Sequence, residues 1–80
     1  MFLMKDELKC MMEQLFLLYK LREHLTTLKV EHENARKRVK FYREIGNMKM
    51  ARVASKTLNS IQKSIKAVQK EIEKLERVCS

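Results

Sequence analysis

Histidine, cysteine and hydroxyl side chains are the residues in this chain that could bind a metal or carry out catalysis. His24 and His32 are eight residues apart, about two helical turns, which is too far for both to bind one metal ion. Cys10 and Cys79 are too few for a disulfide framework or a zinc site. No serine, threonine or cysteine has a basic partner at helical spacing in a setting that could form a pocket. We therefore predict a protein that is not an enzyme and that uses no cofactor or metal.

Basic residues are concentrated in one stretch, and such a cluster can bind an anion. Residues 36–56 contain eight lysines and arginines against one acidic residue, Glu44, and so carry seven of the net eight positive charges. Phe41 and Tyr42 lie among them and could stack on nucleic acid bases. Three interpretations stay open: a solvated surface, a site for an acidic protein and a site for nucleic acid. The eight residues, called the basic tip below, are Arg36, Lys37, Arg38, Lys40, Arg43, Lys49, Arg52 and Lys56.

Two stretches of regular apolar spacing flank the only glycine and would hold the basic tip. Apolar positions recur at alternating steps of three and four residues, the pattern of helices that pack along one another. Gly46 can adopt the left-handed conformation that ends a helix, and Asn47 can cap the next one. The positions expected to face each other are Leu18, Leu21, Leu25, Leu28, His32, Ala35, Val39 and Tyr42 before the turn, and Ala51, Ala54, Leu58, Ile61, Ile65, Val68, Ile72, Leu75 and Cys79 after it.

We predict an all-α fold, an antiparallel two-helix hairpin with a coiled-coil-like seam that spans residues 1–80 as one domain. Its helices are expected at about 4–45 and 48–78, with a turn at 46–47. In this register Arg22 would form an ion pair with Glu71, and His32 would set the register rather than bind a ligand. A domain this small rarely gains more than about 3–5 kcal/mol from its core. We therefore expect self-association, with a dimer favoured, as a four-helix bundle or extended coiled coil.

Residues 1–14 would extend about 20 Å beyond the predicted end of the second helix. The overhang carries an apolar stripe that nothing in its own chain covers, which favours an interface. The alternative is a short third helix that caps the open end, but the segment has no proline, glycine or asparagine to make the bend. The predicted interface residues are Met4, Leu8, Met11, Met12, Leu15 and Phe16.

Sequence features also predict a cytoplasmic location. No apolar run approaches the roughly 18 residues that a transmembrane helix needs. Asp6 and Glu7 occupy positions where a signal peptide would be apolar or basic. Free thiols at Cys10 and Cys79 suit a reducing compartment.

The predicted function is a non-catalytic protein–protein interaction module: an adaptor, an assembly subunit or a small helical chaperone. It would dock through the apolar N-terminal stripe, helix on helix, and through the basic tip onto a helical or acidic partner. The alternative is a nucleic-acid-binding hairpin that places the basic tip on phosphates. In length, helicity and turn position the chain is similar to small helical secretion chaperones and to Rop-type RNA-binding hairpins, which dimerise into four-helix bundles. That similarity concerns the fold and implies no function.

Overall fold

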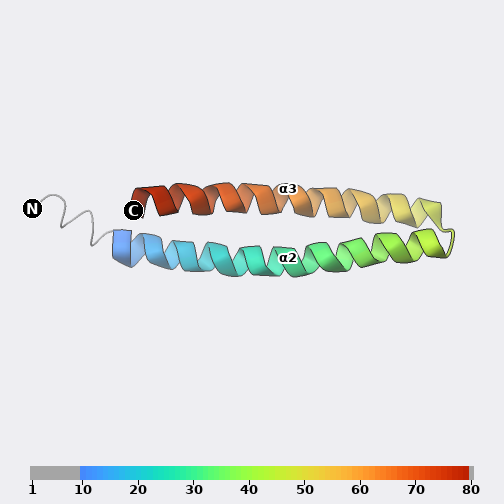
Figure 1. Cartoon of the computed structure of the whole chain (residues 1–80), viewed down its shortest axis with the longest axis horizontal. Coiled ribbons are helices and arrows are strands. Elements are labelled where there is room, and N and C mark those ends of the chain that lie inside the picture. The colour runs from blue at the N-terminus through green and yellow to red at the C-terminus, as the bar shows by residue number, and fades with distance from the viewer. Residues whose placement is uncertain (1–9, 80) are drawn as a thin grey trace, which may run out of the picture.

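The computed structural model describes the backbone of residues 10–79 and the side chains of residues 12–78. A short π-helical turn, η1 (Cys10–Gln14), leads into two long α-helices, α2 (Leu15–Glu44) and α3 (Met48–Cys79). The two helices lie antiparallel and in contact along their length (Figure 1). At about 1.5 Å per residue each is roughly 45 Å long. The predicted all-α two-helix hairpin is confirmed; the predicted helical start at residue 4 lies outside the described residues.

The turn between α2 and α3 uses the residues that the sequence indicated. Gly46 has a φ of +77°, the left-handed conformation. The Gly46 N–H donates to the carbonyl of Arg43 at 3.1 Å, and the Asn47 N–H donates to the carbonyl of Tyr42 at 2.8 Å. This pair of bonds is a Schellman motif, which satisfies the last carbonyls of a helix. The Asn47 side-chain oxygen then accepts the Met50 N–H at 3.1 Å and caps α3.

A single layer of side chains separates the two helices. Each position predicted to face the other helix, from Leu18 to Tyr42 and from Ala51 to Leu75, is buried or half-buried. The side chain of Cys79 lies outside the described residues. Because this layer is the whole core of the residues that the structure describes, the outer faces of both helices are open to solvent in that part of the chain. The buried apolar residues among those described are Leu18, Leu28, Ala35, Val39, Ala51, Ala54 and Ile72.

The two long edges of the hairpin differ in composition. Near the turn, one edge has a groove between Arg36 and Arg43 of α2 and Ser55 of α3, and we call this edge the Arg36 flank. The opposite edge has a groove between Arg38 of α2 and Thr57 of α3, and we call it the Arg38 flank. Residues spaced by multiples of seven along a packed helix stay on the same flank.

The flanks explain why the predicted pairing of Arg22 with Glu71 is wrong. Arg22 Nη2 lies 3.7 Å from Glu76 Oε2 instead. Glu76 is three heptads after Ser55, and Arg22 is two heptads before Arg36, so both are on the Arg36 flank. Glu71 is two heptads after Thr57 and lies on the other flank. Glu76 also lies five residues beyond Glu71 along α3, so the predicted register gave neither the side nor the level of the partner.

Candidate interaction surfaces

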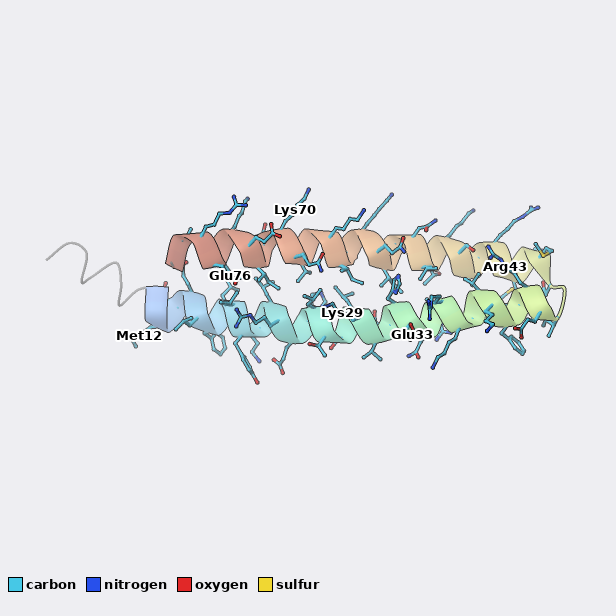
Figure 2. The ribbon with its side chains drawn as sticks, viewed as in Figure 1. Met12, Lys29, Glu33, Arg43, Lys70 and Glu76 are labelled. Atoms are coloured by element: carbon cyan, nitrogen blue, oxygen red, sulfur yellow. The ribbon has the colours of Figure 1, made fainter. Side chains whose placement is uncertain are left out.

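Exposed apolar side chains gather at the end of the hairpin opposite the turn. Met12 is 73% exposed and Phe16 63%. Figure 2 shows Met12 at this end and Arg43 beside the turn at the other. The turn η1 contacts both α2 and α3 here. We call this set the open-end surface; it consists of Met12, Leu15, Phe16, Leu17, Tyr19 and Val78.

The start of α2 is apolar on every side. Residues 15–19 are five consecutive apolar residues, which exceeds the roughly 3.6 residues of one helical turn. Among them only Leu18 is buried, while Leu15, Phe16, Leu17 and Tyr19 are all exposed. A helix that is apolar all round is normally buried on all sides. The surface therefore has the character of an interface.

The predicted N-terminal interface falls partly inside the described residues. Met12, Leu15 and Phe16 are exposed, as an interface requires. Met4 and Leu8 lie outside the described residues, and so does the side chain of Met11. Lys20 Nζ lies 5.6 Å from the centre of the Phe16 ring, so that ring already has one cation over it.

Most of the basic tip has no acidic partner. Arg36 pairs with Glu33 at 3.2 Å, one helical turn earlier. In the part of the chain that the structure describes, the other seven basic residues of the tip form no ion pair, and neither does Glu44. The positive charge at this end of the hairpin is therefore uncompensated.

The helix dipoles do not explain this charge. The first turn of α3 contains no acidic residue, and Lys49 lies in it with Arg52 one turn later. The amino end of a helix is its positive end, so a cation there is unfavourable by about 0.3–1 kcal/mol. Arg43, in the last turn of α2, is the favourable exception. The sequence of α3 thus gives up stability at its start.

Apolar residues surround the turn, and the sequence reasoning missed them. Ile45 is 58% exposed and Met48 55%, one on each side of Gly46–Asn47. They fall outside the three-and-four apolar spacing, so that pattern did not predict them as part of a functional surface. Their position beside the turn, where polar residues are usual, was the available signal. With their exposed neighbours they form the tip apolar cluster, which consists of Phe41, Ile45, Met48, Met50 and Val53.

Two grooves flank the seam near the turn. The groove on the Arg38 flank, about 290 Å³, is lined mainly by Tyr42, Met50 and Val53 with the small Ala35 and Ala54 behind them. Phe41 packs edge-on against Tyr42 with ring centres 5.5 Å apart. The groove on the Arg36 flank, about 630 Å³, is more polar and more basic; its charged lining residues are Arg36, Lys40, Arg43 and Glu44.

His32 is half-buried in the seam beside α3. The Gln62 amide nitrogen lies 3.2 Å from His32 Nε2, and because an amide N–H can only donate, the ring nitrogen is the acceptor in this contact. His24 is exposed. Among the described residues, no group of three histidine, cysteine, aspartate or glutamate side chains could hold a metal ion.

No helix in the described part of the chain is both long enough and apolar enough to cross a bilayer. Comparison with protein-family models, curated proteins and solved structures finds no match to this chain. A functional proposal therefore has to be argued from the open-end surface and the basic tip.

Proposed function

We propose that this protein is a non-catalytic protein–protein interaction module: an adaptor, an assembly subunit or a small helical chaperone. It binds a helical partner at the open-end surface and an anionic partner at the basic tip. The observation that carries the proposal is the all-round apolar start of α2, of which α3 covers only the side at Leu18. The cytoplasm is the proposed location, supported by a chain with two cysteines and no cysteine framework.

A second copy of the chain is the partner favoured for the open-end surface. One side-chain layer is a small core for two helices of about 45 Å, and docking against another hairpin would add a second layer. Burying a side chain such as Phe16 or Met12 contributes roughly 1.5–3 kcal/mol, and a two-fold contact uses each residue twice. The product would be a four-helix bundle or an extended coiled coil.

The test is the mass of the purified chain by light scattering. We expect a dimer for the native chain and a monomer for Phe16→Asp, because a buried carboxylate without a partner is strongly unfavourable. Val30→Asp tests how far the contact extends: Val30 is 57% exposed and lies two heptads after Phe16, on the same side of α2 but outside the open-end surface. That variant should remain a dimer if the contact is confined to the open end, and become a monomer if the bundle extends along this side of α2. Equal masses for the native chain and Phe16→Asp would refute self-association through this surface.

Nucleic acid is the second candidate partner, and it concerns the basic tip. The supporting observation is the uncompensated charge together with the exposed Phe41 ring, which could stack on a base. Binding should weaken with salt at a slope near −0.9 per phosphate contact on duplex DNA. Fluorescence anisotropy with duplex DNA and single-stranded RNA measures that slope. The residues proposed to contact phosphates are Arg36, Lys37, Lys40, Arg43, Lys49 and Arg52.

A further inference from the structure

We propose that the basic tip docks end-on against a bilayer surface rich in anionic phospholipid, with the turn inserted among the headgroups. The inference rests on the part of the proposed function that gives the tip an anionic partner. The inference specifies that partner as a surface that carries negative charge and has an apolar region beneath it. The open-end surface is not involved.

The first support is the chemistry of the turn. Ile45 and Met48 lie on either side of Gly46–Asn47 and are more than half exposed. Phosphates of a nucleic acid would meet the basic residues but offer these two aliphatic side chains nothing, because neither can stack on a base. A bilayer interface accepts both groups, with cations at the headgroups and apolar side chains at the acyl boundary.

The second support is the distribution of charge around the hairpin. Arg36 and Arg43 line one flank, and Arg38 lines the other. Lys37 and Lys40 line another groove together with Arg36 and its partner Glu33. A partner helix lies along one side and could not use all of these charges together. A flat surface met at the turn end is close to every side of the hairpin.

The basic tip also continues onto α3. Lys49, Arg52 and Lys56 follow one another at steps of three and four residues, and all three are exposed. They therefore form one basic stripe along the outside of α3. The stripe runs from the turn along the outer face of α3. The outer face of α2 is on the opposite side of the hairpin.

The third support is the stability that the tip gives up. Lys49 stands at the positive end of the α3 dipole, with no acidic residue in the first turn to offset it. A stretch selected for solubility would carry mixed charges and would not expose Ile45 and Met48. Cations and aliphatic side chains retained together at the turn suit a negatively charged interface.

The distance of each basic residue from the turn determines how much its charge contributes to binding of the bilayer surface. At about 1.5 Å per residue, Lys40, Arg43, Lys49 and Arg52 lie within roughly 10 Å of the turn along the helix axes. That distance is close to the Debye length at physiological salt, about 8 Å. The remaining basic residues of the tip lie further back and are screened more. Each residue near the surface should strengthen binding about fivefold.

The first experiment measures sedimentation of the full chain with vesicles. One set is phosphatidylcholine alone, and the other is an equimolar mixture of phosphatidylcholine and phosphatidylglycerol. We expect binding to the mixed vesicles only, weakening as salt is raised. Replacing Lys40, Arg43 and Lys49 together by glutamine should weaken it roughly a hundredfold. The matched control Lys63→Gln/Lys66→Gln/Lys70→Gln removes the same charge at least about 25 Å from the turn and should change binding only a few-fold.

The second experiment follows insertion of the turn. The chain has no tryptophan, so an introduced one reports its own surroundings without background. The emission of an Ile45→Trp variant should shift to the blue with mixed vesicles and stay unchanged with phosphatidylcholine. A Val30→Trp variant is matched in exposure but lies midway along α2, and it should show no shift with either.

Four results would overturn the proposal. Equal losses for the tip and control charge variants would mean non-specific attraction by the whole chain. Absence of a blue shift at residue 45 would mean that the turn does not insert. Tight binding of duplex DNA or an acidic peptide without vesicle binding would refute the lipid partner while keeping the tip as an anion site. If none of these probes binds, the tip also leaves the proposed function, whereas the mass measurement on Phe16→Asp is unaffected.

Discussion

The lysine at the start of α3 offers a prediction in which stability and binding change in opposite directions. Lys49 lies in the first turn, where the unpaired N–H groups and the helix dipole favour a negative charge. Replacing Lys49 by glutamate should therefore stabilise the hairpin. The same change should weaken binding of the basic tip to an anionic surface.

The expected magnitude follows from two contributions. Removing the unfavourable cation gains about 0.3–1 kcal/mol, and placing an anion at the same position gains a similar amount. A new pairing with Arg52, three residues later, adds about 0.2–0.5 kcal/mol. The free energy of unfolding should rise by about 1–2 kcal/mol in total. For a domain of this size each kcal/mol raises Tm by about 4–8 °C. Lys49→Gln should give about half the effect.

The assay is urea and thermal unfolding followed by circular dichroism at low salt. All variants must be compared at one chain concentration, because self-association would itself change the apparent stability. The control is Lys63→Glu, which makes the same charge change on the same helix more than three turns from its start. Since the dipole effect falls off within the first turn, only a pairing with Lys66, three residues later, and the general reduction in repulsion should remain there. High salt should shrink the difference between the two variants.

Two outcomes would refute this reasoning. If Lys49→Glu destabilises the hairpin, the α3 amino terminus does not have the electrostatic character assigned to it. If Lys49→Glu and Lys63→Glu raise stability equally, the gain comes from net charge alone. In both cases the basic tip would not be giving up stability for binding.

Three further predictions concern the seam and the turn, and urea unfolding checks each of them. Asn47→Ala should cost about 1 kcal/mol through loss of the bond to the Met50 N–H, while Asn47→Ser should stay near the native value. Leu28→Ala should lower the free energy of unfolding by about 2–3 kcal/mol because Leu28 is buried. A loss below about 1 kcal/mol would show that neighbouring side chains fill the cavity. His32→Leu should stabilise the hairpin by about 1 kcal/mol and broaden the choice of register, which a parallel mass measurement would detect as mixed assemblies. An unchanged or lower stability for His32→Leu would show that its contact with Gln62 matters more than the apolar layer.

The hairpin itself was predictable because its determinants are local or periodic. The three-and-four spacing marked the seam, and Gly46–Asn47 marked the turn, since a left-handed residue followed by a capping side chain suits a tight connection. The ion-pair partner of Arg22 was not predictable from the list of positions that face each other across the two helices. The flank of a residue depends on its angle around the helix, and that angle separates Glu76 from Glu71.

The candidate sites were predictable only in part. Charge counting located the basic tip, and hydrophobicity located the apolar start of α2. The exposure of Ile45 and Met48 required the structure, because residues beside a turn follow no helical period. Function was harder still, since a docking surface needs no fixed catalytic residues and therefore leaves no motif in the sequence.

The arrangement of the ends has a mechanical consequence. The ends of α2 and α3 that the turn does not join lie next to each other (Figure 1). A force applied through them would unzip the helices one layer at a time, beginning near Leu18 and Leu75 and reaching Ala51 last. Resistance to such pulling is set by single layers of side chains and not by the sum of the seam. Held instead by the turn and the end of α3, the same hairpin would carry the force along the backbone of α3, and the seam would not lie in the path of the force.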